Sequence, residues 1–162
     1  TNSNFVNPHG LHDENHYTTA IDLAYITAEA MKHNHFRHIV SMQRARIGEG
    51  ESARVIGNKN KMLWQYDGAN GVKTGYTKNS GRCLVSAAKR NGMQLIAVVL
   101  NHPNMWADST ALLDYGFDSF EMVDVEALCM FGDYGQKAMD TILNTPESLR
   151  PKRYPAPKIA LY

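Results

Sequence analysis

Residues 70–78 read Asn-Gly-Val-Lys-Thr-Gly-Tyr-Thr-Lys, and this stretch, with the pattern that follows it, decides the fold. The mostly apolar run 82–89 predicts a short strand, and Asn91-Gly92 is the strongest two-residue hairpin signal. Residues 94–101 are rich in β-branched side chains and predict a second strand that is buried on both faces. The sequence therefore predicts an antiparallel hairpin beside an edge strand that carries Lys-Thr-Gly.

Lys73-Thr74-Gly75 is one of three short motifs that together form the active site of penicillin-binding proteins and serine β-lactamases. Four other stretches carry the same likeness: 4–11 (Asn-Phe-Val-Asn-Pro-His-Gly-Leu), 17–26 (Tyr-Thr-Thr-Ala-Ile-Asp-Leu-Ala-Tyr-Ile), 58–63 (Asn-Lys-Asn-Lys-Met-Leu) and 112–120 (Leu-Leu-Asp-Tyr-Gly-Phe-Asp-Ser-Phe). On these residues the chain resembles the serine D-alanyl-D-alanine carboxypeptidases, the low-molecular-weight penicillin-binding proteins. The resemblance extends from about residue 2 to residue 120.

The resemblance implies an α/β (α+β) fold of the β-lactamase/transpeptidase type, in which helices flank an antiparallel sheet, here as an incomplete portion. Residues 1–120 are expected to be the C-terminal part of the penicillin-binding catalytic domain. Residues 121–162 are too few for the small β-rich domain that follows in the family. We therefore expect them to be a tail or the start of a truncated C-terminal domain.

The resemblance also implies an enzyme that trims the terminal D-Ala from peptidoglycan stem peptides through an acyl-enzyme and that binds β-lactams. Such enzymes use no cofactor and no metal, and they act outside the cytoplasm, in the cell envelope, with the full-length protein associated with the membrane. Two alternatives stay open. One is a β-lactamase of the same fold, which nitrocefin turnover would reveal. The other is a non-catalytic fragment that binds cell-wall peptides.

The motif assigns roles to five residues. The substrate ends in a free carboxylate, and Lys73 and Thr74 are suited to hold it. In the family this lysine also tunes proton transfer to the leaving amine. Gly75 is expected to keep the cleft open, and the backbone N–H of Tyr76 to complete the oxyanion hole. Lys59 matches a second carboxylate-gripping position, although the alignment there needs a one-residue gap.

The nucleophile is missing from the pattern. The single Ser-x-x-Lys match is Ser86-Ala-Ala-Lys89, in a predicted strand, where residues three apart point to opposite faces. No Ser-x-Asn occurs. We therefore expect the chain by itself to be inactive and to be part of a longer enzyme, through truncation, through cleavage with the N-terminal half present as a separate chain, or because the gene encodes only this part. The first two are favoured, because an incomplete sheet exposes strand edges and apolar faces.

Composition sets broad limits. The 162 residues are 43% apolar and 20% charged, which suits one globular domain with or without a short appendage. A net charge of +1 gives no electrostatic reason to expect a nucleic-acid partner. Cys83 and Cys129 are too few for a disulfide framework. His12 and His16 have helical ligand spacing, but Pro8 and Gly10 favour a loop there, so no metal site is expected.

Helical spacing appears early in the chain. We expect a helix to start near Thr18 or Thr19, with Asp22 completing a capping box and with Leu23, Ile26, Ala30 and Met31 forming its apolar side. A second short helix is possible at 33–41, followed by a turn at 48–51.

The last third of the chain contains weaker patterns. A helix is expected from about 108 to 115, stopped by Gly116, with Leu112 and Leu113 packed on the sheet. Residues 122–131 fit either a strand or a short helix. The segment 145–157 contains four prolines and is expected to be extended and loop-like.

Overall fold

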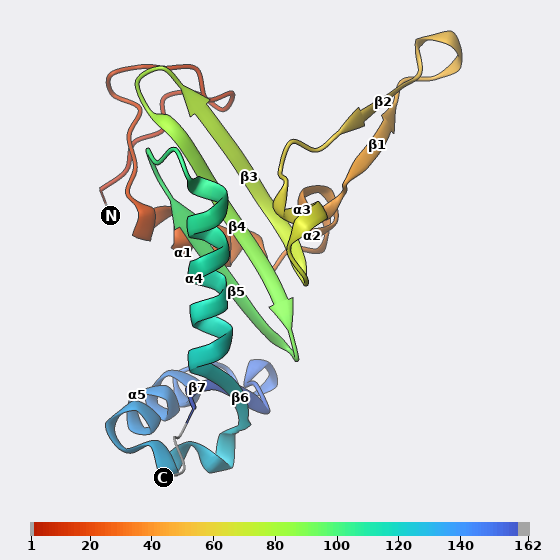
Figure 1. The fold of residues 1–162 in the computed structure, drawn as a ribbon. Coiled ribbons are helices and arrows are strands. Elements are labelled where there is room, and N and C mark those ends of the chain that lie inside the picture. The colour runs from red at the N-terminus through yellow and green to blue at the C-terminus, as the bar shows by residue number, and fades with distance from the viewer. Residues whose placement is uncertain (1, 159–162) are drawn as a thin grey trace. The chain divides into compact units, whose positions relative to one another are not determined.

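A computed structural model describes residues 2–158, which form two compact units. Unit 1 contains the chain up to Lys89 together with Gln94–Leu113, and unit 2 contains Arg90–Met93 together with the chain from Asp114 onward. Figure 1 shows the elements of both. The long helix α4 contributes residues to each unit, and the domain boundary expected at residue 120 remains a prediction.

The centre of unit 1 is a sheet with the strand order β3-β4-β5. Its strands are β3 (Ala69–Thr77), β4 (Gly81–Arg90) and β5 (Met93–Val99). The predicted hairpin is confirmed: Asn91 and Gly92 both have positive φ, 49° and 87°, as a tight turn between twisted antiparallel strands requires. β3 pairs antiparallel with β4 and lies at the edge of the sheet.

Burial of β5 differs from the expectation. Met93, Ala97 and Val99 are buried, whereas Ile96 and Val98 on the other face are partly exposed. The strand predicted from the run of β-branched residues is therefore confirmed. Its predicted burial on both faces is wrong. Within the described residues one face of β5 is incompletely covered.

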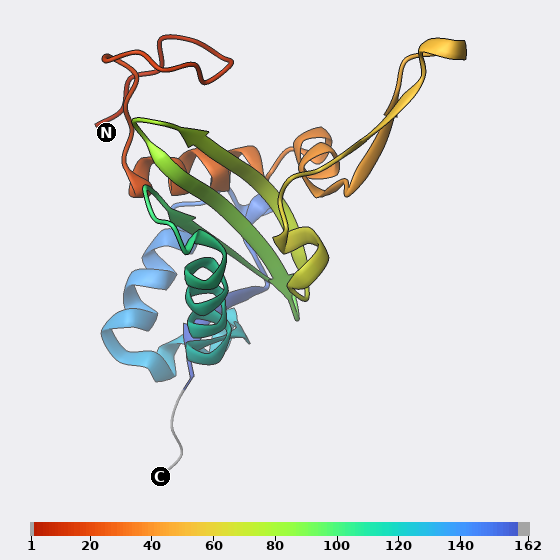
Figure 2. The same ribbon diagram turned by 45° about the horizontal axis from the view of Figure 1, so that its top comes forward.

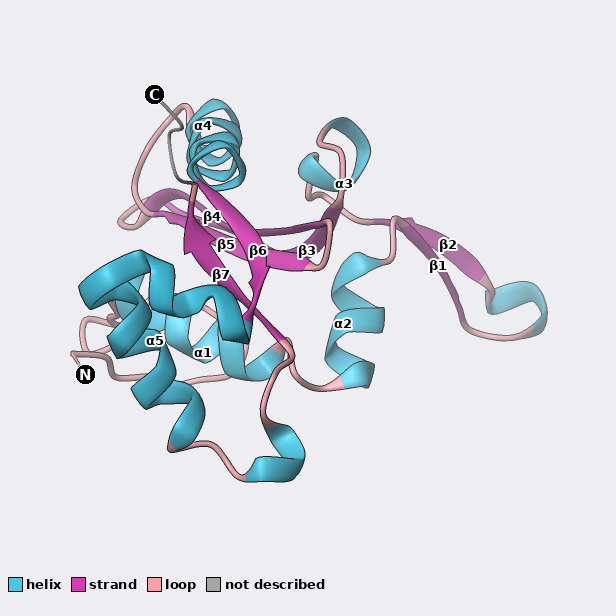
Figure 3. Ribbon diagram, turned by 90° about the horizontal axis from the view of Figure 1, so that it is seen from below, coloured by secondary structure: helices cyan, strands magenta, loops and turns pink. Residues whose placement is uncertain are grey.

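Helices cover both faces of this sheet (Figure 3). They are α1 (Ala20–Ala30) and α2 (Asn34–Ser41) on one side, and α3 (Met62–Gln65) and α4 (Met105–Ser119) on the other. The expected second short helix is thus confirmed as α2. An apolar cluster around Met31, Val72 and Ala87 joins the α1–α2 side to the sheet.

A hairpin extends from unit 1 where only a turn was expected. β1 (Arg44–Ile47) pairs antiparallel with β2 (Arg54–Gly57) across a tip that contains the short helix η1 (Gly50–Ser52). Figures 1 and 2 show this hairpin projecting away from the sheet. All four residues of β2 are exposed, and its sequence, Arg-Val-Ile-Gly, lacks the alternation of apolar and polar residues that predicts a half-buried strand. In β1, Arg-Ala-Arg-Ile, the alternation extends over four residues only.

The start of α1 is as predicted, and its buried side is so in part. Thr19 is the N-cap, and its hydroxyl accepts the Asp22 N–H at 3.1 Å. Of the residues expected to face the core, Met31 is buried, Leu23 and Ala30 are partly buried, and Ile26 is 48% exposed. The buried residues within the helix itself are the polar Asp22 and Thr27. α1 is apolar on more than one side, so apolar spacing could not select which side this chain buries.

Hydrogen bonds from the N-terminal segment fix that side. The Ser3 hydroxyl and the Asn2 N–H donate to one oxygen of the Asp22 carboxylate at 2.6 and 2.7 Å. The bond from Ser3, followed by that from Asn2, lowers the pKa of Asp22 below its ordinary value of 3.8. The charged carboxylate is thereby the anchor between the first residues and α1.

α4 runs through Gly116 to Ser119, so the predicted stop at Gly116 is wrong. A helical glycine costs only about 1 kcal/mol relative to alanine, which packing can exceed. The next residue, Phe117, lies under the Arg90 guanidinium, 4.7 Å from its ring centre. Of the two leucines expected on the sheet, Leu113 is buried and Leu112 is 49% exposed, because neighbours on a helix point about 100° apart.

Unit 2 has its own small core of Leu128, Ala138, Ile142 and Ala156. Its elements are β6 (Phe120–Asp124), η2 (Val125–Phe131), α5 (Gly132–Leu143), η3 (Glu147–Leu149) and β7 (Arg153–Pro157), with β6 and β7 antiparallel. Residues 122–131 thus contain both a strand end and a short helix. The expectation of a loop-like tail is wrong for β7, where the prolines lie in a two-stranded pair with no third strand to hydrogen-bond among the described residues.

Residues 2–158 contain no helix that is long and apolar enough to cross a membrane.

Gly71 offers a test of the packing between α2 and β3. A Cβ placed at Gly71 would lie 3.1 Å from Cγ2 of Val40, tighter than most packed contacts, so the Val40 side chain would have to shift. We expect Gly71→Ala to lower the free energy of unfolding by about 1–3 kcal/mol, as overpacking does. Urea denaturation followed by circular dichroism measures this. Gly57→Ala is the matched control, because nothing lies within 4 Å of a Cβ there; equal losses in both variants would contradict the packing.

Asp22 gives a pH-dependent prediction. Because its pKa is lowered in the folded state, the carboxylate stabilises the fold fully at pH values above its ordinary pKa. This stabilisation is lost as the pH falls below that value and through the lowered one. We expect Asp22→Asn to be less stable than the parent at pH 7 and the difference to shrink below about pH 4. Thermal unfolding from pH 7 to pH 2.5 checks this, with Glu14→Gln as the control; a pH-independent difference would refute the ion's role.

Candidate active site

The Lys-Thr-Gly triplet lies in the second half of the edge strand β3. Lys73 is opposite Val85 and Thr74 opposite Leu84 in the register with β4. Lys73 is exposed, and its Nζ donates to the backbone carbonyl of Thr74 at 2.5 Å. Because β3 is an edge strand, every second backbone N–H and C=O group along it has no partner in the sheet. The strand thus presents one ammonium group and a row of backbone groups to a ligand.

A cavity of about 570 Å³ lies along this strand. Lys73, Thr74, Gly75 and Tyr76 all line it, so the structure brings together four of the five predicted site residues. The opposite wall comes from the N-terminal segment and includes Phe5, Gly10, His16, Tyr17 and Thr18. Figure 1 shows this segment beside the end of β3, although the two are about 60 residues apart in sequence.

The charge on the described residues that line the cavity is positive. Among the described residues that line it, Lys73 is the cation and none is a carboxylate. Hydroxyl groups of Thr18, Thr74 and Thr77 add hydrogen-bond donors. An ammonium group beside hydroxyls, with no competing carboxylate, suits an anionic ligand such as a peptide carboxylate.

Gly75 and Tyr76 continue β3 beyond Thr74 and also line the cavity. A Cβ at Gly75 would lie 3.6 Å from Cβ of Cys83, an ordinary contact, so any exclusion of a side chain there must come from a bound ligand. The Tyr76 side chain is 70% exposed and lies under the Arg82 guanidinium, 5.7 Å from its ring centre. Its phenol is therefore held at the surface, separate from the role predicted for its N–H group.

Lys59 is the predicted residue that the structure does not bring into the cavity. It is exposed in the loop between β2 and α3 and is not among the described residues lining that space. Its neighbour Asn60 is buried instead, and the Asn60 side chain donates to the Gly71 carbonyl at 2.9 Å. The sequence did not predict this role of Asn60, whose bond ties the loop to β3 two residues before Lys73.

His16 is a second residue whose place at the cavity was not predicted from the sequence. It lines the cavity, its Nδ1 accepts the Val6 N–H at 3.2 Å, and its ring packs edge-on against Phe5. The sequence raised His16 only as a metal ligand, because nothing in it signals that the N-terminal segment folds back over β3. Across residues 2–158 no group of three or more His, Cys, Asp and Glu residues could hold a metal ion.

Comparison with known proteins gives consistent results. The family described as D-alanyl-D-alanine carboxypeptidase matches residues 1–104. The chain is 33% identical over 124 residues to the D-alanyl-D-alanine carboxypeptidase DacF of Bacillus subtilis, covering 74% of this chain and 32% of the relative. It is 36% identical over 126 residues to DacA of Haemophilus influenzae, covering 74% of this chain and 31% of the relative. The chain therefore spans about a third of the length of these curated relatives.

Solved structures match as well. A mutant of the Streptomyces K15 DD-transpeptidase is 34% identical with a TM-score of 0.67, covering 73% of this chain and 49% of the other. Penicillin binding protein 5 from Haemophilus influenzae is 34% identical with a TM-score of 0.68, covering 76% of this chain and 37% of the other. These likenesses confirm the predicted fold class and show that this chain represents part of the domain.

Proposed function

Because this chain belongs to the D-alanyl-D-alanine carboxypeptidase family, we propose that it forms one wall of the active site of a serine D-Ala-D-Ala carboxypeptidase. The observation that carries the proposal is the cavity along β3, where Lys73 is the cation and no described lining residue is a carboxylate. The substrate is a peptidoglycan stem peptide that ends in D-Ala-D-Ala, and β-lactams occupy the same cavity. The site of action is the cell envelope, outside the cytoplasm.

The chemistry divides the roles as follows. A serine hydroxyl attacks the carbonyl of the penultimate D-Ala, the peptide bond breaks, and the terminal D-Ala leaves as its amine after receiving a proton. Water then hydrolyses the ester of the acyl-enzyme. Lys73 and Thr74 hold the terminal carboxylate, and the Tyr76 N–H donates a hydrogen bond to the developing oxyanion. Lys59, outside the cavity lining, assists from a distance by its charge.

Ser86 is unsuited to be the nucleophile. It lies in β4, is fully buried, and its hydroxyl is directed to the Ala97 carbonyl at 3.4 Å. Lys89, the other half of the apparent motif, is exposed, so the two side chains do not meet. This supports the argument that residues three apart on a strand face opposite sides. The nucleophile then belongs to polypeptide outside these 162 residues.

Exposed apolar side chains on α1 support such a further polypeptide. Ile21 is 61% exposed, Tyr25 69% and Ile26 48%, all on one short helix. A group of large apolar residues of this kind usually marks a surface that another element covers. We propose that the segment carrying the nucleophile packs against this side of α1, either in the same polypeptide or as a separate chain.

Removal of Lys73 tests the proposed site directly. In the product of the complete gene, we expect Lys73→Ala to slow acylation by benzylpenicillin at least about 30-fold, since one charge-assisted contact in the transition state is lost. Lys78→Ala removes an exposed lysine five residues further on, outside the cavity lining, and should change the rate less than about twofold. Lys59→Ala should fall between the two. Time-resolved intact-mass spectrometry measures the rates, and an unchanged rate for Lys73→Ala would refute the assignment.

The variant Ser86→Ala tests whether the buried Ser86 takes part in the reaction. We expect this variant of the complete gene product to gain the mass of penicillin and to release D-Ala from a D-Ala-D-Ala peptide at the parental rates. Its stability should fall by no more than about 1 kcal/mol, for one lost hydrogen bond. Loss of the penicillin adduct with unchanged circular dichroism would show that Ser86 is the nucleophile after all. Rapid nitrocefin turnover by the parent would instead favour a β-lactamase.

A further inference from the structure

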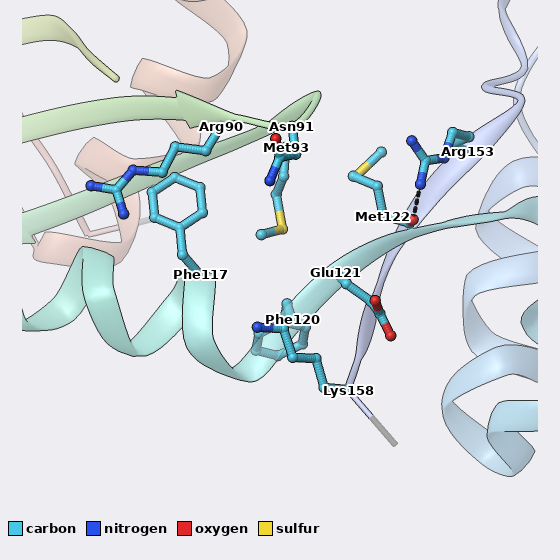
Figure 4. Close-up of a pocket in the computed structure, with 9 residues that line it drawn as sticks. All are labelled: Arg90, Asn91, Met93, Phe117, Phe120, Glu121, Met122, Arg153 and Lys158. Carbon is cyan, nitrogen blue, oxygen red and sulfur yellow. Dashed lines mark hydrogen bonds between the residues drawn. The ribbon is translucent and has the colours of Figure 1, made fainter. Parts of the chain in front are cut away.

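A second cavity, of about 460 Å³, lies wholly within unit 2. It shares no described lining residue with the cavity along β3. Figure 4 shows its residues, which come from the β4–β5 turn, the end of α4, β6 and the two ends of β7. Its volume lies in the range of about 300–1,000 Å³ that is usual for small-molecule sites.

Three cations surround this cavity. Arg90, Arg153 and Lys158 line it, against a single lining carboxylate, that of Glu121, among the described residues. Figure 4 shows that the three come from different sides of the hollow. Its lining therefore carries an excess of positive charge that attracts an anion.

The two guanidinium groups are held in place by neighbours. Arg90 lies over the Phe117 ring and 4.0 Å from Asp114, with 30% of its side chain exposed. Arg153 donates to the backbone carbonyl of Met122 and lies 3.7 Å from Asp124. Neither aspartate lines the cavity, so both partners fix the arginines without occupying the space between them.

Apart from the polar Asn91, the other described lining residues are apolar. Met93, which is buried, and Met122 face the same hollow, together with Phe117 and Phe120 (Figure 4). Methionine side chains adapt to ligands of varied shape, and aromatic rings provide a large apolar contact area. A small inorganic ion would leave these side chains unused.

We propose that this cavity binds an amphiphilic anion, with a phosphate-diester or carboxylate head at the cations and a short acyl or aromatic portion against the methionines and phenylalanines. The ligand could be the head and first methylenes of an anionic membrane lipid or a soluble molecule of the same chemistry. The site is independent of the reaction proposed for the β3 cavity.

The methionines make the site measurable. In the 162-residue chain labelled with ¹³C-methyl methionine, we expect dihexanoyl phosphatidylglycerol, below its micelle concentration, to shift the Met93 and Met122 signals saturably. Met31 and Met62, buried in unit 1, are internal controls and should not move. Lys158→Ala should weaken binding at least about threefold, whereas Lys152→Ala, the loss of an exposed lysine that does not line the cavity, should change it less than twofold.

Comparison ligands decide the chemistry. Equal affinity for zwitterionic dihexanoyl phosphatidylcholine would overturn the role of charge, and equal affinity for inorganic phosphate would overturn the role of the apolar portion. Absence of shifts at Met93 and Met122 would overturn the site itself. Vesicles of phosphatidylglycerol distinguish the source. Co-sedimentation that Lys158→Ala weakens supports a membrane lipid, and saturable binding of the short-chain lipid alone supports a soluble ligand.

Discussion

The hydrogen bond from the buried Asn60 side chain to the Gly71 carbonyl, together with the contact of Val40 on Gly71, determines where β3 runs. Both act two residues before Lys73, on a strand that has only one neighbour in the sheet. β4 fixes the register from the other side, which leaves Lys73 and Thr74 at the cavity. A lysine on an edge strand without such support would be an ordinary surface charge. Here the buried Asn60 amide and the close packing of α2 on β3 hold the strand in place, so that Lys73 lines the cavity.

The N-terminal segment depends on a comparable anchor. Asp22 of α1 accepts hydrogen bonds from Asn2 and Ser3, and the chain that follows returns over the end of β3 to complete the cavity. His12 pairs with Asn79 in the turn after β3, 3.0 Å apart, which closes the same loop from its other side. Polar contacts at the two ends of the N-terminal segment therefore hold it over β3. Several of its apolar side chains, such as Phe5 and Leu11, are exposed and contribute little to this packing.

Features that depend on residues close together in the sequence were predicted better than features that depend on contacts between distant residues. Asn91-Gly92, the strand after it and the Thr19 cap are local patterns, and the structure confirms each of them. The burial of Asp22 on α1 was not predictable, because Asp22 is held by residues nearly 20 positions earlier. Four residues that line the cavity, Lys73 to Tyr76, were predicted together because they form a continuous motif in one strand. His16 and Asn60 were missed because their roles depend on contacts distant in sequence, and Lys59 carried the one alignment that needed a gap.

The central claim is that β3 grips the carboxylate of the substrate in an active site whose nucleophile lies elsewhere. A crystal structure of the complete gene product acylated by benzylpenicillin tests it most directly. We predict the ester on a serine outside these 162 residues. The penicillin carboxylate should lie within hydrogen-bond distance of the Thr74 hydroxyl and near the Lys73 ammonium, with the ester carbonyl oxygen accepting the Tyr76 N–H. An ester on Ser86, or a carboxylate bound away from β3, would contradict it.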